Sequence, residues 1–252
     1  MSIPLDFAFL EAALLAGVRI IAFLVLAPPF SFSGFPLRIK GMLAVALSLL
    51  VAPRAAGGTP VSMDTGPFLL ALIEQLVVGG LLGFLCAMVF AAVQSAGNLI
   101  DQFAGFQLSS AYDPQMHVNG AQLTRLMQMV ALALLFVSGG AELLLNGLFR
   151  TFDALPVTGV LDPAIGLKLL PGLGQLFIAA AQIAGPVVVV LFLADVGLGI
   201  LTRVSPSLNA LQLGFPLKIL ITLLFGGVIF LALPRVVGTL TDDALGLMGA
   251  LH

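Results

Sequence analysis

The stretch LVVGGLLGFLCAMVFAAV, from Leu76 to Val93, contains no charged residue. A helix needs about 20 apolar residues to cross the hydrocarbon core of a bilayer. Backbone groups in lipid must be bonded within the segment, and a β-barrel strand would alternate apolar and polar residues, which this stretch does not. The stretch therefore predicts a hydrophobic helix.

The rest of the chain has the same character. Hydrophobic residues make up 60% of the 252 residues and charged residues only 9%, whereas a soluble domain is about a quarter charged. Five further apolar runs lie at residues 12–27, 41–52, 126–137, 176–194 and 219–233. We therefore expect an all-α, membrane-associated bundle of about six hydrophobic helices, some kinked or broken, assembled with partner subunits. The run at 41–52 is short for a span, so it is either an incomplete span or a helix packed on protein.

Small residues recur every fourth position within and beyond the opening stretch, at Gly79, Gly83, Ala87, Ala91 and Ser95. Residues at this spacing share one face of a helix. Small side chains on one face let another helix backbone approach closely. We expect this face, and Gly79, Gly83 and Ala87 in particular, to pack against a second helix.

A short motif occurs twice. Gly34-Phe35-Pro36-Leu37-Arg38 returns as Gly214-Phe215-Pro216-Leu217-Lys218, and the apolar runs that follow end in Pro53-Arg54 and Pro234-Arg235. The motif is typical of a tight turn whose proline opens a helix, and the second proline would close that helix. The repeat predicts a paired hairpin, with a chance match as the alternative.

Three charges interrupt apolar runs: Arg19, Glu74 and Asp195. Such charges are costly in hydrocarbon and face a partner or a wet cavity. Buried ion pairs between helices are one interpretation, and a proton relay is the other. Asp195 and Arg203 are separated by about 12 Å of helical rise and some 80° of rotation, which disfavours a direct pair within one straight helix.

Catalytic and cofactor motifs are not found in the sequence. His117 and His252 have no cysteines or paired carboxylates at metal-ligand spacing, and the single cysteine, Cys86, lies within an apolar run. The net charge of −2 and the scattered basic residues argue against nucleic acid as a partner. We expect no enzymatic activity, no cofactor and no metal.

The polar stretch from Gly97 to Gln122 combines turn residues with Phe103, Phe106 and Tyr112. One interpretation is an ordinary loop between helices. The other is a constriction, because loops of this length often carry a function and aromatic residues beside small polar ones could close a channel.

Several of these motifs, in this order, resemble the FliR family of flagellar biosynthesis proteins, which has related injectisome members. The resemblance covers the chain from Arg19 to Pro234, and it rests on Gln94-Ser95-Ala96-Gly97, Gly105-Phe106, Asp113-Pro114, Leu193-Ala194-Asp195, Gly199, Arg203, Pro206 and Gly214-Phe215-Pro216-Leu217-Lys218. It implies a single subunit of the type III export gate over residues 1–252, with a FliP-like part at 1–150 and a FliQ-like hairpin part at 151–252. The implied location is the bacterial inner membrane, in the flagellar basal body.

The resemblance also implies partners and site residues. The partners would be FliP-type, FliQ-type and FlhB-type subunits, unfolded flagellar export substrates and membrane lipid. The stretch from 105 to 112 would form part of the plug of the closed channel, through Gly105, Phe106, Gln107, Leu108 and Tyr112. The expected structural or helix-packing residues are Gly79, Gly83, Ala87, Asp113, Pro114, Asp195, Arg203, Pro206, Gly214 and Pro216.

Two other functions fit the same residues. A secondary transporter would account for the repeat and for Glu74 and Asp195, although transporter repeats often have opposite topology. A non-conducting membrane scaffold is the other function. The small-residue face at Gly79 and Gly83 fits a scaffold and a gate equally.

Overall fold

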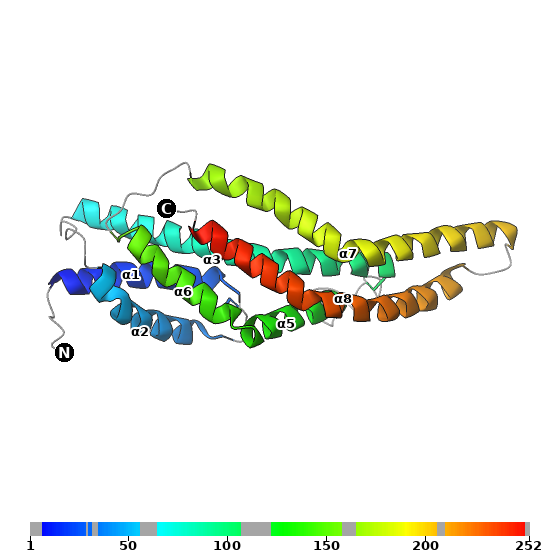
Figure 1. Cartoon of the computed structure of the whole chain (residues 1–252), viewed down its shortest axis with the longest axis horizontal. Helices are drawn as coiled ribbons and strands as arrows, with labels where there is room; N and C mark the ends of the chain where they lie inside the picture. The colour runs from blue at the N-terminus through cyan, green and yellow to red at the C-terminus, as the bar shows by residue number, and fades with distance from the viewer. Residues whose placement is uncertain are drawn as a thin grey trace. The chain divides into compact units, whose positions relative to one another are not determined.

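The computed structural model describes residues 7–28, 30–31, 35–55, 65–106, 122–157, 165–205 and 210–249. These residues confirm the all-α fold class (Figure 1). The helices are α1 (Phe7–Leu26), α2 (Leu37–Ala55), α3 (Thr65–Ala104), α5 (Gln122–Val137), α6 (Gly140–Ala154), α7 (Ile165–Val204) and α8 (Ala210–Gly249). Six of them contain the six apolar runs, and α6 is an additional helix.

The additional helix α6 follows a break in the chain after α5. Gly139 adopts φ +74°, and the axes of α5 and α6 differ by 70°. The carbonyl of Gly139 accepts hydrogen bonds from the amides of Glu142 and Leu143, which starts the new helix. The buried face of α6 carries Leu144 and Leu148, and Glu142, Asn146 and Arg150 interrupt the sequence of this helix, so it shows no continuous apolar run.

Four helices are long and apolar enough to cross a membrane, by length and composition, among the residues described. They are α1 and the segments Gly66–Ala104, Phe177–Val204 and Leu213–Gly246. The bent pair α5 and α6 adds a fifth if it acts as one span. The short helix α2 is not among them, and it packs on α1 and α6. Of the two interpretations of the run at 41–52, the structure thus supports a helix packed on protein.

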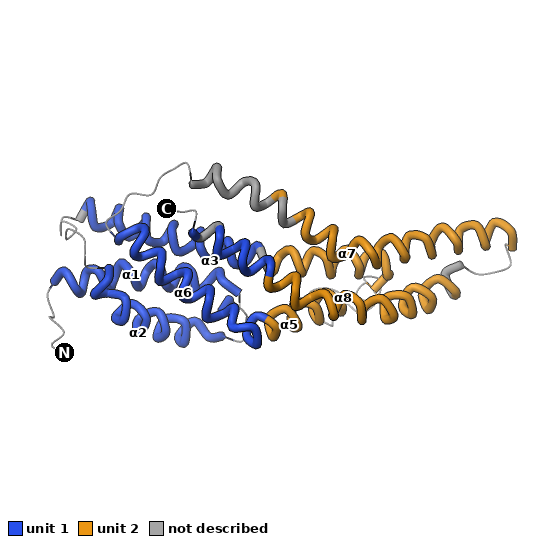
Figure 2. Tube along the Cα trace, viewed as in Figure 1, with its two compact units in different colours: residues 1–89, 135–171, 239–252 blue, residues 90–134, 172–238 orange. Residues whose placement is uncertain are grey.

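The chain divides into two compact units (Figure 2). Unit 1 comprises residues 1–89, 135–171 and 239–252, and unit 2 comprises residues 90–134 and 172–238. The helices α3, α5, α7 and α8 each contribute residues to both units. The expected division at residue 150 stays a prediction.

Unit 1 is organised around α1. Its side chains Leu15, Ile20, Phe23 and Leu24 are fully enclosed. Helix α2 lies along α1, and Gly17 faces Ser48 across this contact, so that a Cβ at Gly17 would lie 3.6 Å from the Ser48 side chain. Small residues at the interface bring the two backbones close together.

The repeated motif begins a helix only in its first copy. Pro36 directly precedes α2, and its carbonyl accepts hydrogen bonds from the amides of Ile39 and Lys40. In the second copy, Pro216 lies inside α8, which already begins at Ala210, so the expectation of a helix start there was wrong. Pro53 and Pro234 also lie inside their helices and do not close them. Proline has no backbone N–H, so each helix continues through its internal proline at the loss of one backbone hydrogen bond.

Candidate functional site

The polar stretch that resembles a plug leaves α3 through a glycine in the left-handed conformation. Gly105 has φ +81°, its amide donates to the carbonyl of Gln102 (3.3 Å), and the amide of Phe106 donates to the carbonyl of Asp101 (3.1 Å). This pair of bonds is the Schellman arrangement that ends many helices. Glycine is required at such a position because a Cβ is strained there. The direction in which the chain leaves α3 therefore depends on Gly105.

Gly105 is also in contact with α8, within unit 2. A Cβ added at Gly105 would lie 3.0 Å from Cε1 of Phe215. Phe215 belongs to the second copy of the repeated motif, so one turn of α8 packs against the point where α3 ends. The absence of a side chain at Gly105 makes this approach possible.

The two helices that flank the polar stretch are bonded to each other. Asp101, near the end of α3, is fully buried, and its Oδ2 accepts hydrogen bonds from the backbone amide (2.9 Å) and the hydroxyl of Thr124, in the first turn of α5. A carboxylate at a helix N-terminus is stabilised by the helix dipole. Gly97 allows the approach, since a Cβ there would lie 2.8 Å from Cα of Thr124. The ends of the polar stretch are thus held together by Asp101 and Thr124.

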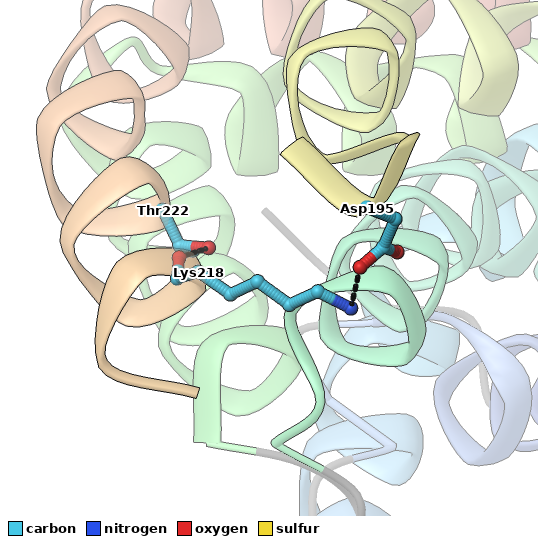
Figure 3. A network of polar contacts seen from close by, with 3 residues as sticks. All are labelled: Asp195, Lys218 and Thr222. Atoms are coloured by element: carbon cyan, nitrogen blue, oxygen red, sulfur yellow. Dashed lines mark hydrogen bonds and ion pairs between the residues drawn. The ribbon is translucent and has the colours of Figure 1, made fainter. Parts of the chain in front are cut away.

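An ion pair joins α7 and α8 in the same unit. Nζ of Lys218 lies 2.6 Å from Oδ1 of Asp195, and Thr222 donates to the carbonyl of Lys218 one turn further along α8 (Figure 3). The sequence showed that Asp195 and Arg203 were poorly placed to pair, but it did not identify the partner of Asp195. Arg203 is exposed in the last turn of α7.

Together these contacts form what we call the loop anchor, made of Asp101, Gly105, Thr124, Asp195, Phe215 and Lys218. Its residues come from α3, α5, α7 and α8, all within unit 2. A single turn of α8 supplies Phe215 to α3 and Lys218 to α7. The loop anchor therefore connects the base of the polar stretch to the α7 and α8 pair.

The second polar cluster lies in unit 1 around Arg19, whose side chain is completely buried. Its Nε donates to Oε1 of Gln75 (2.7 Å), and its Nη1 and Nη2 donate to the carbonyls of Thr151 (3.1 Å) and Leu155 (2.9 Å). Gln75 in turn donates to the carbonyl of Val157 (3.1 Å). The guanidinium group thus satisfies carbonyls at the C-terminal end of α6, where a cation is favoured by the helix dipole.

An aromatic ring completes the surroundings of Arg19. The guanidinium carbon lies 4.3 Å from the centre of the Phe152 ring, which is a favourable cation–π distance. Within the described part of the chain no carboxylate is bonded to Arg19, so carbonyls and a ring take the place of the expected ion pair. The structure gives Glu74, half-buried on α3, no polar partner among the described residues.

The small-residue face of α3 also meets α1 in unit 1. A Cβ at Gly79 would overlap the carbonyl oxygen of Arg19, and one at Gly83 would lie 2.8 Å from Cβ of Leu26. Ala87, the next position of the face, is half-buried. The backbone of α3 therefore passes very close to α1 at Arg19 and again at Phe23 and Leu26.

The other residues expected at the site are spread over the chain. Gly214 is buried in α8, where a Cβ would lie 3.4 Å from Leu198 of α7. Phe106 is half-buried at the end of α3. The expected plug residues Gln107, Leu108 and Tyr112 and the expected structural residues Asp113, Pro114 and Pro206 lie outside the described residues. The described residues contain no group of three or more His, Cys, Asp or Glu that could hold a metal ion.

Three residues that the sequence analysis did not single out prove to be central: Gln75, Asp101 and Thr124. Gln75 and Asp101 are both fully buried residues of α3. Gln75 lies in an apolar part of the helix, where a polar side chain is a usable signal, whereas Asp101 lies in the polar stretch and does not stand out from its neighbours. Thr124 carries no comparable signal, because a threonine in the first turn of a helix is common.

Comparison with known proteins supports one family. Residues 10–244 match the model of the family described as bacterial export proteins, family 1. The flagellar biosynthetic protein FliR of Escherichia coli (strain K12) is 32% identical over 204 residues, which cover 80% of this chain and 77% of that protein. FliR of Bacillus subtilis (strain 168) is 32% identical over 215 residues, covering 84% and 83%.

A relative from a different system is similar over a shorter length. The Yop proteins translocation protein T of Yersinia pestis is 30% identical over 185 residues, covering 71% of this chain and 70% of that protein. The family match spans both units and almost every helix described above. The chain belongs to family 1 of the bacterial export proteins, the family of the flagellar biosynthetic protein FliR.

Proposed function

We propose that the chain is a non-enzymatic subunit of the flagellar type III protein export gate in the bacterial inner membrane. With FliP-type and FliQ-type subunits, and next to an FlhB-type subunit, it would form the channel for unfolded flagellar proteins. The observation that carries this proposal is the family match over residues 10–244. The apolar helices that this length includes support a position in the membrane.

The proposal assigns the closure of the channel to the stretch from Gly105 to Tyr112. The loop anchor supports this assignment, because a closing segment needs a firm base. Gly105 sets the direction of the chain at the end of α3, and the bonds between Asp101 and Thr124 join the helices on either side. In this proposal Phe106 and the residues after it block ions until a substrate enters.

A deletion tests the closure. Removing residues 106–111 should raise the passage of ions through the complete gate in living cells, while the gate still assembles. The matched control replaces the same residues with a Gly-Ser sequence of equal length, which preserves the chain length but removes Phe106. We expect both variants to leak. An ion leak equal to that of the unsubstituted gate in both would contradict the sealing role.

The second candidate function is a scaffold that holds other membrane proteins and conducts nothing. The helices α7 and α8 have a large apolar surface, since only 22% of an 18-residue apolar window in each is buried within the chain. This surface favours a scaffold as much as it favours a gate. Photocrosslinking from position 106 or 112 to a stalled export substrate distinguishes the two. A gate predicts a substrate adduct, and a scaffold predicts none.

A further inference from the structure

Helix α3 exposes an apolar face in unit 1, which we call the outer face of α3. Six large apolar side chains form it, and each is between 41% and 60% exposed: Leu69, Leu70, Ile73, Leu76, Val77 and Phe84. At 100° of rotation per residue they fall within about 120° of the helix circumference and extend over about four turns. The outer face is therefore one continuous apolar stripe.

A single carboxylate interrupts the apolar character of this part of the helix. Glu74 is the only charged residue of α3 from Thr65 to Ile100. It lies at the edge of the outer face, one turn from Leu70 and one turn from Val77, and its side chain is half-buried. None of the described residues forms an ion pair or a hydrogen bond with it.

The buried cation of unit 1 does not serve as the partner of Glu74. Arg19 is bonded to Gln75, the residue next to Glu74, but its three nitrogens donate to Gln75, Thr151 and Leu155. Its guanidinium carbon also lies over the ring of Phe152. The bonds of Arg19 are thus directed at α6 and the chain after it, and Glu74 depends on a cation from elsewhere.

The outer face is a surface that another molecule covers, because an apolar patch of this size is unfavourable in water. Whatever covers Leu70, Ile73 and Val77 also removes Glu74 from water. A carboxylate that loses its water without gaining a hydrogen bond or a cation is costly. Lipid chains offer neither, so the covering molecule has to carry a positive charge of its own.

The charge also argues against a second copy of this chain. Two copies that packed through the same face would be related by a two-fold axis, and each would present Glu74 to the other. Like charges brought together in a covered interface repel. The occupant is therefore a different chain, with a basic residue where this chain has an acidic one.

We propose that the outer face of α3 binds an apolar helix of a different subunit, and that one Lys or Arg on that helix pairs with Glu74. A helix fits because its backbone groups are bonded within the segment, so that it can present a purely apolar stripe around one charge. This inference deepens the proposed function, since it needs a partner subunit, but it does not need the chain to close a channel.

Photocrosslinking in the complete gate identifies the occupant. A benzoylphenylalanine placed at position 73 or 77 of the otherwise unsubstituted chain should form an adduct with one partner subunit. The crosslinked peptide should be apolar and should contain a Lys or Arg within one helical turn of the adduct. Position 50, an exposed leucine on α2, is the control and should not reach the same peptide.

A charge exchange then tests the pairing. Glu74→Lys should lower the amount of that subunit that copurifies with the chain at least about tenfold, because breaking a covered ion pair is strongly unfavourable. Asp153→Lys, at an exposed carboxylate of α6 in the same unit, should leave copurification unchanged. Replacing the crosslinked Lys or Arg by Glu in the partner should restore binding of Glu74→Lys to within about twofold.

Several outcomes would overturn the inference. They are an adduct between two copies of this chain, no protein adduct from either position, a crosslinked peptide without a basic residue, and a charge exchange that restores nothing. The ion leak after removal of residues 106–111 is a separate readout, so the sealing role and the pairing of Glu74 can fail independently.

A neutral substitution keeps the test valid if Glu74→Lys does not fold. Glu74→Gln preserves the shape of the side chain, and in the purified chain alone it should leave the unfolding temperature unchanged, because Glu74 has no bonded partner among the described residues. In the complete gate it should still reduce copurification of the crosslinked subunit. A loss of stability in the chain alone would show that Glu74 pairs within its own chain, which would contradict the inference.

Discussion

Gly79 and Gly80 are neighbours in the sequence but have different surroundings in the structure. A Cβ at Gly79 would overlap the backbone of α1 at Arg19, whereas a Cβ at Gly80 would meet only Cδ1 of Leu26, at 3.8 Å. The backbone of Arg19 cannot move aside to make room for a Cβ, whereas the end of the Leu26 side chain can. The two residues therefore separate the effect of close helix contact from the general preference of helices for alanine over glycine.

We expect Gly79→Ala to lower the free energy of unfolding by about 2–3 kcal/mol, because α1 and α3 are forced apart. Gly80→Ala, the matched control, should leave stability unchanged or raise it by up to about 1 kcal/mol. Thermal unfolding of the purified chain, followed by circular dichroism, measures both. Equal effects of the two substitutions would mean that the close contact at Gly79 does not exist.

Arg19 gives a second prediction at this scale. Arg19→Met keeps a long side chain but leaves Oε1 of Gln75 and the carbonyl of Leu155 without their donor, and the carbonyl of Thr151 with the amide of Leu155 alone. We expect a loss of about 3 kcal/mol in unfolding free energy, since buried acceptors without donors are costly. Arg19→Lys should lose about half as much, because one ammonium group cannot reach all three acceptors. The exposed Arg38→Met serves as the control, and a loss as large as that of Arg19→Met would contradict the explanation.

At the scale of the elements, the notable feature is how the long helices end and meet. Helix α3 ends at Ala104 through the bonds of Gly105 and Phe106, and α5 begins with Thr124 bonded to Asp101. Helix α8 continues through Pro216, and the turn around this proline contacts both α3 and α7. Because Phe215 and Lys218 lie in that turn, the loop anchor depends on α8 being continuous there.

We expect Gly105→Ala to destabilise the end of α3 by about 1–2 kcal/mol, because a Cβ is strained in the left-handed conformation, and to push on Phe215. Adding Phe215→Ala to Gly105→Ala should remove the contact part of the cost but not the conformational part. Gly105→Asn should cost less than Gly105→Ala, because asparagine tolerates this conformation better. Hydrogen exchange at the amides of Gly105 and Phe106 measures the local effect. Unchanged exchange in Gly105→Ala would contradict the role of Gly105.

For the whole molecule, the burial of the candidate spans differs between helices. In an 18-residue apolar window of each candidate span, 61% of the residues are buried within the chain in α1, but only 22% in α7 and in α8. A helix that is apolar on all sides and only partly buried is made to contact lipid or another protein. The helices α7 and α8 are therefore the part of the molecule most open to its surroundings.

Cysteine labelling distinguishes lipid from protein at this surface. Phe192→Cys on α7 and Leu223→Cys on α8 replace exposed side chains, while Leu191→Cys replaces one that is fully buried next to Phe192. In the purified chain alone, we expect a small apolar maleimide to label positions 192 and 223 but not 191. In the co-expressed gate, positions 192 and 223 should become protected. Equal labelling in both samples would show that lipid, and not a subunit, covers this surface. The native Cys86 is buried and adds little background.

The sequence by itself determined the all-α class, the apolar character of six of the helices and the family, because these follow from composition, from run length and from ordered motifs. The four-residue spacing of small residues also identified the face that carries Gly79 and Gly83, because the residues of one helix face are related by sequence spacing alone. Only the tertiary structure decided that Asp195 pairs with Lys218, that Arg19 bonds carbonyls of α6 and not a carboxylate, and that the second repeated motif lies inside α8. Each of these depends on which distant parts of the chain meet. Sequence spacing within one helix carries no information about contacts between different helices, and these contacts are decided by how the helices pack.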